Sequence, residues 1–211
     1  MINLINENTW IISDTHFNHD AIVDYEPIRN AFLQDEGFAN QDEAMITLWN
    51  ANVSDDHLVL HLGDFSFKNI DVIKELKGRI VLLVGNHDIK TLNKFKEYEL
   101  EFPDKFLLVQ GVPGTDLEST DQKGISGLVL DVCDKKIMFS HYPLISEDPY
   151  LRGKAKDSRD AMAEVFENES CDLNIHGHLH TKDAFTDKSR EINVSVERMG
   201  FQPVRLKDIL K

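Results

Sequence analysis

Polar side chains that can bind metal ions follow five separate apolar runs of this sequence. They are carboxylates, imidazoles and one amide: Asp14 and His16, Asp64, Asn86 and His87, His141, and His178 and His180. Five of the nine histidines fall in this set, and three of the five clusters adjoin a glycine, which lets backbone and ligand approach closely. Mixed imidazole and carboxylate donors without thiolates favour manganese, iron, zinc or nickel over calcium. The residue types therefore predict a site for divalent transition metals.

The set is large enough to hold two ions. Two ions about 3.5–4 Å apart need one carboxylate that bridges them, and Asp64 is the lone acid at the end of its strand. Two divalent ions, balanced by about two carboxylates and one hydroxide, leave roughly one positive charge, which favours an anionic substrate. Asn86 helps to preserve this surplus because its ligand atom is a neutral carbonyl oxygen. Beside it, His87 carries an imidazole that can act as an acid or a base, and Asp88 is a carboxylate able to orient an imidazole.

Short strands must carry these side chains to one place. Apolar runs predict strands at residues 9–13, 57–62, 81–84, 106–109, 127–132, 136–140, 173–176 and 191–196. Helical periodicity predicts helices at residues 41–52, 69–77, 90–98 and 155–168, with a terminal turn of helix from residue 206. Strands and helices alternate in the first half, which indicates a mainly parallel sheet with ligands at the carboxyl ends of its strands.

Two local predictions accompany this pattern. If the backbone after the first strand stays extended, Asp14 and His16 point to the same side, as residues two apart must. Residues 25–40 carry aromatic side chains without a clear period, so we expect an irregular insertion that packs against the core.

Length, charge and cysteine content limit the class of protein. The 211 residues, 41% of them hydrophobic, predict a single domain spanning residues 1–211. No apolar run reaches the roughly 18 residues of a membrane span, and the N-terminus lacks the pattern of a signal peptide. Cys133 and Cys171 form no close-spaced pair, so we expect reduced, buried thiols in a cytoplasmic protein.

The net charge of −14 repels polyanions, and we expect no strong binding to nucleic acids. Bound metal ions can reverse the sign of the charge locally, so a small phosphorylated substrate stays compatible with this composition. Nothing in the sequence predicts an oligomeric state.

The motifs of this sequence resemble the full set of the calcineurin-like metallophosphoesterases: Asp14-x-His16, Gly63-Asp64, Gly85-Asn86-His87-Asp88, His141 and Gly177-His178-x-His180. Small stand-alone bacterial and phage members are the most similar. Their signatures Ser-Asp-Thr-His-Phe, His-Leu-Gly-Asp-Phe and Ser-His-Tyr-Pro occur here at residues 13–17, 61–65 and 140–143. The resemblance extends from residue 14 to residue 180 and shows no departure at a metal ligand. It implies an α/β fold, a four-layer α/β/β/α sandwich of two mixed sheets flanked by helices.

The resemblance also implies roles for the polar residues. It implies two ligand sets that share one carboxylate: Asp14, His16, Asp64 and His180 for one ion, and Asp64, Asn86, His141 and His178 for the other. A metal-bridging hydroxide would attack in line with the departing oxygen. In this scheme His87 protonates the leaving group or stabilises charge on phosphorus, and Asp88 holds its imidazole. The implied reaction is hydrolysis of a phosphodiester or phosphomonoester, including nucleotide-like esters, with two divalent ions, manganese before iron, zinc or nickel.

Some residues have two interpretations. His19 either contacts the substrate phosphate or caps the next helix. Arg152 begins the densest basic run of the chain: Arg152, Lys154, Lys156 and Arg159. This run is either a lid that contacts phosphate or leaving group, or a solvated loop that enters a helix near residue 157. Tyr142 and Phe17 either line the pocket or pack in the core.

Other functions stay open as well. Within the enzyme class, a diesterase is favoured slightly because His87 can help an alkoxide to leave. A nuclease lacks the support of a basic track, and a protein phosphatase lacks the support of a groove-forming segment. A non-catalytic scaffold would be expected to lose ligands or the acid, and this sequence retains all of them.

Overall fold

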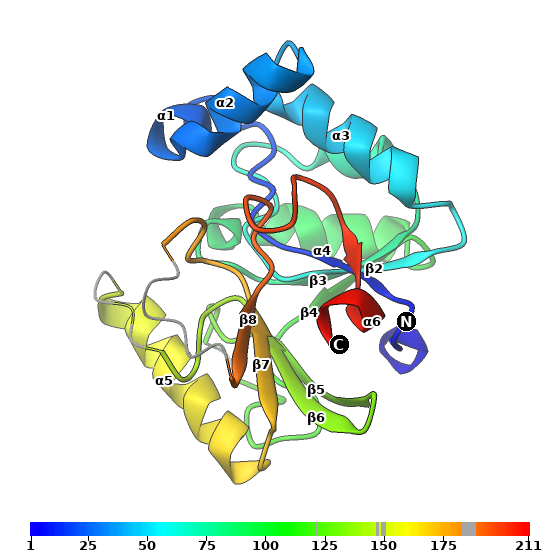
Figure 1. Cartoon of the computed structure of the whole chain (residues 1–211). Helices are drawn as coiled ribbons and strands as arrows, with labels where there is room; N and C mark the ends of the chain where they lie inside the picture. Colours follow the sequence, from blue (N-terminus) through cyan, green and yellow to red (C-terminus); the bar gives the residue numbers. More distant parts are fainter. Residues whose placement is uncertain (121, 147, 149–150, 183–188) are drawn as a thin grey trace.

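A computed structural model describes residues 1–120, 122–146, 148, 151–182 and 189–211 (Figure 1). The helices and strands of the described residues follow this order: η1 (Ile2–Leu4), β1 (Trp10–Ile12), α1 (Ile22–Tyr25), α2 (Pro27–Glu36), α3 (Gln41–Asn52), β2 (Leu58–His61), η2 (Asp71–Lys74), β3 (Arg79–Leu83), η3 (Asp88–Lys90), α4 (Leu92–Glu101), β4 (Phe106–Val109), β5 (Gly127–Val132), β6 (Lys135–Ser140), α5 (Gly153–Asn168), β7 (Leu173–His176), β8 (Glu191–Asn193), β9 (Val204–Arg205) and α6 (Leu206–Ile209).

Two sheets occupy the centre of the molecule (Figure 1). Within the described residues, the first has the strand order β4-β3-β2-β1-β9, in which β1 to β4 are parallel and β9 is antiparallel to β1. The second has the order β5-β6-β7-β8, in which β5 is antiparallel to β6 and the others are parallel. Ser13 forms a parallel bridge with Ser195, which joins the chain just beyond β1 to the chain just beyond β8. The predicted class, an α/β fold of two mixed sheets flanked by helices, is confirmed.

Each sheet has apolar side chains on both faces. Along β3, Ile80 and Leu82 pack with α3 and α4, whereas Val81 and Leu83 pack in the space between the two sheets. Residues two apart on a strand share a face, so one continuous apolar run serves two cores. On the outer face of the second sheet, Met162 of α5 belongs to a third core. Helix, sheet, sheet and helix therefore form the four expected layers (Figure 1).

Helix α2 occupies most of the segment predicted to be irregular, residues 25–40, so that prediction is wrong. Pro27 is the first residue of α2, a position where a helix needs no N–H, and Gly37 ends the helix in the left-handed conformation with φ of 76°. The only buried residue of α2 is Arg29, while Phe32 and Leu33 are partly buried. An apolar stripe, the usual signal of a surface helix, is therefore weak here.

The helix predicted at residues 69–77 is also wrong for most of its length, because only η2 forms. The carbonyl of Lys77 accepts a hydrogen bond from Trp49 Nε1 at 2.9 Å, and the carbonyl of Glu75 accepts one from Asn50 Nδ2 at 2.8 Å. The carbonyl groups of Glu75 and Lys77 thus have hydrogen-bond partners on α3 and need no longer helix around them.

The strand predicted at residues 191–196 ends early, at Asn193. The side-chain oxygen of Asn193 accepts a hydrogen bond from the amide of Ser195 at 3.0 Å, which turns the chain out of the ladder. The remaining predicted helices and strands are present, with ends shifted by a few residues.

Both cysteines are free, as expected, but only Cys171 is buried. Cys133 is exposed in the turn between β5 and β6, so the expectation of a buried thiol is wrong for it. Among the described residues no helix combines the length and the apolar character that crossing a bilayer requires.

The core between the sheets gives a first prediction. Ile175 of β7 is fully buried there, so Ile175→Val should lower the free energy of unfolding by about 1 kcal/mol. The same substitution at the 43% exposed Ile28 should change it by less than about 0.5 kcal/mol. Urea unfolding of the two variants measures the difference, and equal effects would contradict this placement of the core.

Candidate metal centre

The polar strand ends lie at the edge where the carboxyl ends of the parallel strands of both sheets meet. In each case the polar residues follow directly or closely after a strand: Asp14 and His16 after β1, Asp64 after β2, Asn86 and His87 after β3, His141 after β6, and His178 and His180 after β7. Parallel strands deliver their carboxyl ends to one edge, which is the usual place for a ligand in α/β sheets.

The carboxylate of Asp64 lies at the centre of this group. Its Oδ2 atom is 3.6 Å from Nε2 of His16, 3.5 Å from Nε2 of His141 and 4.0 Å from Nε2 of His87. The ligand atoms form two overlapping groups, within each of which all atoms lie within 4.8 Å of one another: Asp14, His16 and His180, and Asp14, Asp64 and His141. These distances are short enough for shared ions.

Several nitrogen atoms are oriented as metal ligands require. His141 Nδ1 donates to the carbonyl of Leu62 at 2.9 Å, so its Nε2 atom carries the lone pair that faces Asp64 and lies 3.0 Å from Asn86 Oδ1. The buried Nε2 atom of His16 has no hydrogen-bond partner. Buried polar atoms nearly always have a partner, and a cation beside Asp64 would supply one. The residues present therefore fit divalent metal ions.

His178 lies beside this centre rather than in either group of ligand atoms. Its ring is 5.0 Å from the ring of His141, and its Nε2 atom is 2.9 Å from Oδ2 of Asp148. A carboxylate on one ring nitrogen of a metal-binding histidine orients the other nitrogen. Asp148 was not predicted from the sequence, because it follows no apolar run.

The turn after β1 is not extended, so the reason expected for the convergence of Asp14 and His16 is wrong. Their φ angles are 61° and 50°, in the left-handed region that strains a residue with a Cβ atom. Side chains of α2 and α3 hold this turn by its carbonyls. Arg29 donates to the carbonyls of Asp14 at 2.6 Å and Thr15 at 3.2 Å, and Gln41 donates to that of His16 at 2.6 Å.

Arg29 also connects this turn, through Glu197, to the candidate metal ligand His180. Glu197 Oε1 accepts from Arg29 Nε at 2.6 Å and from His180 Nδ1 at 2.9 Å. Burial lowers the pKa of His180, but its hydrogen bond to Glu197 and the charge of Asp14 outweigh burial and raise that pKa to about 9. The local field thus favours a positive charge where the His180 ring lies.

Asp88 differs from its expected role. Its buried carboxylate does not hold the His87 ring but accepts backbone N–H groups of Asp64 at 2.7 Å, Phe65 at 2.9 Å and Gly85 at 2.9 Å. Burial raises the pKa of Asp88, as does the neighbouring Asp64, while these amide donors lower it. Because residue 88 begins η3, its side chain turns back under the strand ends and fixes the Asp64 loop against the β3 end.

The glycines of the motifs let the strand-end loops pack on the carboxylates. A Cβ atom at Gly85 would overlap Oδ1 of Asp64, and one at Gly177 would overlap Oδ2 of Asp14. We expected these glycines to let the backbone approach a ligand closely. They do permit a close approach, but it is between the backbone and the carboxylates of Asp64 and Asp14.

The structure bears on the two interpretations given for His19, Phe17 and Tyr142. The ring of His19 stacks on Phe67 at 4.2 Å and lies 6.5 Å from the ring of His87, whereas no side chain caps α1, so the capping alternative is wrong. Phe17 packs on Phe65 in the core. Tyr142 is buried between the rings of His141 and His178, and it also lines a cavity.

The basic run except Arg152 belongs to α5, which begins at Gly153, earlier than expected. Arg152 is exposed just before the helix and donates to the carbonyl of Leu151 at 2.8 Å. Arg159 donates to the carbonyls of Pro143, Leu144 and Ser146, which ties α5 to the chain after His141. Most of the run is therefore helical, so the solvated-loop interpretation is wrong for it, and contact of the run with phosphate or leaving group stays a prediction.

Arg29, Gln41, Asp148 and Glu197 were missed from the sequence. Glu197 had a usable signal, because it follows the predicted strand at 191–196 just as the other candidates follow theirs. The other three lie on helices or in a loop and follow no strand, so strand-end reasoning could not reach them.

A family profile described as the calcineurin-like phosphoesterase superfamily domain matches residues 8–196. The chain belongs to this superfamily. The match extends from just before β1 to the residue before Glu197 and includes every candidate ligand. Divalent metals are typical of calcineurin-like phosphoesterases, in agreement with the two groups of candidate ligands.

Relatives of this calcineurin-like phosphoesterase chain come from archaea, phage and bacteria. An uncharacterized protein of Methanocaldococcus jannaschii is 27% identical over an alignment of 215 positions, which covers 96% of this chain and 89% of that protein. The Gene 66 protein of Mycobacterium phage L5 is 25% identical over an alignment of 206 positions, which covers 92% of this chain and 88% of the phage protein. The crystal structure of a protein of unknown function from Aquifex aeolicus is 26% identical, with a TM-score of 0.67 over 95% of this chain and 96% of that one. The similarity to a phage protein agrees with the predicted small phage type.

Metal binding should stabilise this phosphoesterase domain, because a cation offsets the repulsion among its buried carboxylates. With manganese at about a hundred times its Kd, we expect about 2.7 kcal/mol of stabilisation, or an increase in Tm of about 5–10 °C over the EDTA-treated protein. Asp64→Asn should lose most of this increase, and Asp131→Asn, an exposed position on β5, should keep it. Calorimetric scans measure both; an increase that Asp64→Asn retains would remove Asp64 from the centre.

Arg29 should be irreplaceable by lysine. An ammonium cannot make the four-partner fork to Glu197, Gln41 and the two carbonyls, so Arg29→Lys should cost about 3–5 kcal/mol of unfolding free energy in metal-free protein. The exposed Arg152→Lys is the matched control and should stay within about 0.5 kcal/mol of wild type. Urea unfolding decides, and equal stability of the two variants would refute this role.

Proposed function

We propose that this protein is a divalent-metal-dependent phosphoester hydrolase that acts on phosphodiesters in preference to phosphomonoesters. One observation carries the proposal: Oδ2 of Asp64 lies within 4.0 Å of the Nε2 atoms of His16, His87 and His141 at the common edge of both sheets. A carboxylate surrounded by imidazoles from separate strands is what a pair of ions with one bridging ligand requires.

Two ligand sets would hold the ions, with Asp64 in both: Asp14, His16, Asp64 and His180, and Asp64, Asn86, His141 and His178. When bound, the ions supply Lewis acidity toward the phosphoryl oxygens and lower the pKa of water to a value useful near neutral pH. The neutral Asn86 keeps the net charge of the centre favourable for an anionic ester.

His87 is the proposed general acid. Its side chain is 41% exposed, whereas those of His16 and His141 are buried, so it borders the solvent side from which a substrate approaches. Its backbone amide donates to Asp64 Oδ1 at 2.9 Å, which fixes the residue beside the centre. From there the imidazolium can donate a proton to the departing oxygen, and this help matters most for an alkoxide leaving group. This supports the preference for diesters.

Manganese is the proposed ion, with iron, zinc or nickel as alternatives, because the donors are nitrogen and oxygen and neither cysteine belongs to the groups of candidate ligands. A small phosphorylated substrate and a cytoplasmic location stay predictions. The predicted location is based on the two cysteines, which are both free.

The test is hydrolysis of bis-p-nitrophenyl phosphate with added manganese. Wild type should turn over and Asp64→Asn should lose about a thousandfold or more in kcat/KM, because both ions lose a ligand. His87→Ala should lose only about tenfold on this activated ester but about a hundredfold or more on diesters with poorer leaving groups, where protonation limits the rate. His57→Ala is the matched histidine control. His57 lies just before β2, at the end of that strand opposite to Asp64, and its Nδ1 atom accepts a hydrogen bond from Trp10.

The outcomes separate the alternatives. No metal-dependent turnover in wild type would favour a non-catalytic scaffold. A His87→Ala loss that stays the same across leaving groups would leave the metal centre in place but remove the general acid.

A further inference from the structure

A cavity of about 540 Å³ adjoins the candidate metal centre on the side of α5. Two of its lining residues come directly from the site: Tyr142 follows the candidate ligand His141, and Ile89 lies two residues after His87. The Tyr142 ring is 5.0 Å from the ring of His141 and 4.9 Å from that of His178. A group attached to a phosphate at the centre would therefore meet this cavity, whose volume is that of an ordinary small-molecule site.

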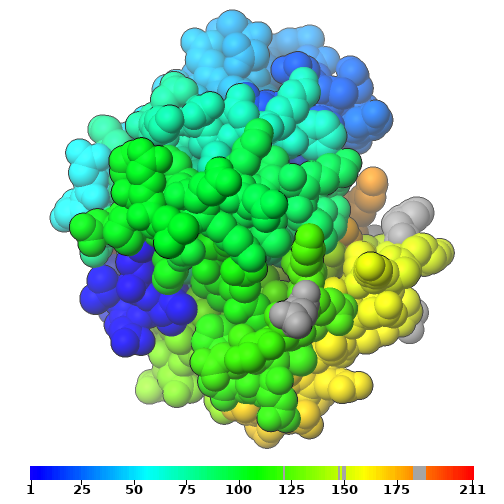
Figure 2. Space-filling model, turned by 180° about the vertical axis from the view of Figure 1, so that it is seen from behind, coloured from blue at the N-terminus to red at the C-terminus, as the bar shows by residue number. Residues whose placement is uncertain are grey.

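The opposite wall joins two parts of the chain that are distant in sequence. Gln122 Nε2 donates to Ser158 Oγ at 2.8 Å, and Ser158 Oγ donates to the carbonyl of Lys154 at 2.9 Å. A Cβ atom at Gly124 would lie 2.7 Å from Ser158 Oγ, so glycine lets the segment before β5 contact α5. In the space-filling view that green segment lies beside the yellow surface of α5 (Figure 2). This wall is therefore built by specific contacts.

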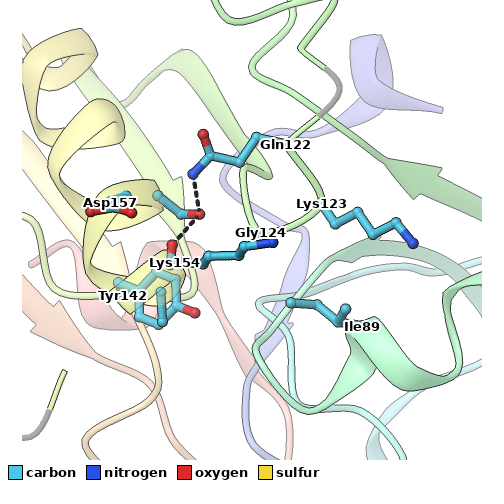
Figure 3. A pocket seen from close by; sticks show the side chains of 9 residues that line it. Ile89, Gln122, Lys123, Gly124, Tyr142, Lys154 and Asp157 are labelled. Carbon is cyan, nitrogen blue, oxygen red and sulfur yellow. Dashed lines mark hydrogen bonds between the residues drawn. The ribbon is translucent and has the colours of Figure 1, made fainter. Parts of the chain in front are cut away.

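Two lysines, Lys123 and Lys154, and one acid, Asp157, line the cavity in a chain whose net charge is −14. Lys154 extends from α5 toward the segment that carries Lys123, the Lys123 side chain extends from that segment away from Lys154 in this view, and Ile89 lies below both (Figure 3). Neither lysine forms an ion pair within the described part of the chain, whereas Lys156, two residues along the same helix, pairs with Asp160. Asp157 also lines the cavity, on the side away from Lys123 in this view.

The chemistry of the lining selects the kind of ligand. A lysine ammonium only donates hydrogen bonds, and the amide nitrogen of Gln122 is engaged by Ser158. The hydroxyl of Tyr142, a buried residue, has no hydrogen-bond partner among the described residues. The two lysine ammonium groups beside the apolar face of Ile89 suit an anionic group on a ring or short chain, with the carboxylate of Asp157 on the side away from Lys123.

We propose that this cavity binds a second acidic group of the substrate, so that the substrate class is phosphoesters whose organic part carries its own carboxylate or phosphate. The inference depends on the proposed function, because the cavity selects the part of the ester that lies beyond the phosphate at the centre. Lys123 and Lys154 are the specificity-determining residues, and Tyr142 and Ile89 contact the apolar part between the two anionic groups.

Calorimetric binding to the manganese-loaded protein tests this without turnover. The probes are phenylphosphonate and 4-carboxyphenylphosphonate, which differ only in the carboxylate. Wild type should bind the carboxylated probe about tenfold more tightly, and Lys123→Met or Lys154→Met should each reduce that preference about two- to fivefold, as loss of one exposed charge pair does. Neither variant should change the Kd for phenylphosphonate by more than about twofold, because salt screens the effect of either lysine on the phosphonate group.

Lys156→Met is the matched control, because it removes the same charge from the same helix outside the cavity. It should retain the wild-type preference. Equal Kd values for the two probes in wild type, no binding of either probe, or a preference that survives both lysine substitutions would overturn the inference. These results are distinguishable from failure of the proposed function, which is read from turnover of bis-p-nitrophenyl phosphate.

Discussion

The candidate centre depends on the ion pair and the hydrogen bonds that the guanidinium of Arg29 forms. This guanidinium is fully enclosed and contacts four partners at once: the carboxylate of Glu197, the side chain of Gln41, and the carbonyls of Asp14 and Thr15. A left-handed turn such as that at residues 14–16 persists only where its surroundings compensate the strain. One planar fork of donors can bind the turn and the carboxylate that orients His180 together, which no other side chain can do.

A second constraint is the balance of buried charge. The carboxylates of Asp14, Asp64, Asp88 and Glu197 are all buried near one another, and Arg29 is the permanent cation among them. Backbone amides compensate part of this charge at Asp88. Unpaired buried charges are costly, so the arrangement calls for further positive charge at Asp14 and Asp64. Divalent ions there would stabilise the fold and attract a phosphoester in spite of the acidic surface.

The sequence permitted most of this to be predicted where the chemistry is carried by strands. An apolar run that ends in Asp, Asn or His is visible in one dimension, and the parallel sheet brings such ends together. Helix α2 was missed because its buried residue, Arg29, is polar and makes no apolar stripe. Asp88 was misplaced because adjacency to His87 in sequence says little about direction at the start of a 3-10 turn. The convergence of Asp14 and His16 was expected for the wrong reason, since the positive φ angles depend on Arg29 and Gln41.

In the proposed function, metal binding and selection of the organic part of the substrate depend largely on different parts of this fold, and this explains why the first was easier to predict. The candidate ligands come from strand ends of both sheets, and Arg29 and Asp88 hold the backbone of the loops that carry Asp14 and Asp64. The cavity is formed by α5 and the segment before β5, through contacts such as that of Gly124 with Ser158. A metal centre requires particular residue types, whereas a cavity requires only a shape and a few charges that many sequences supply. Substitutions at the cavity can thus change which ester binds while the buried carboxylates and their partners stay as they are.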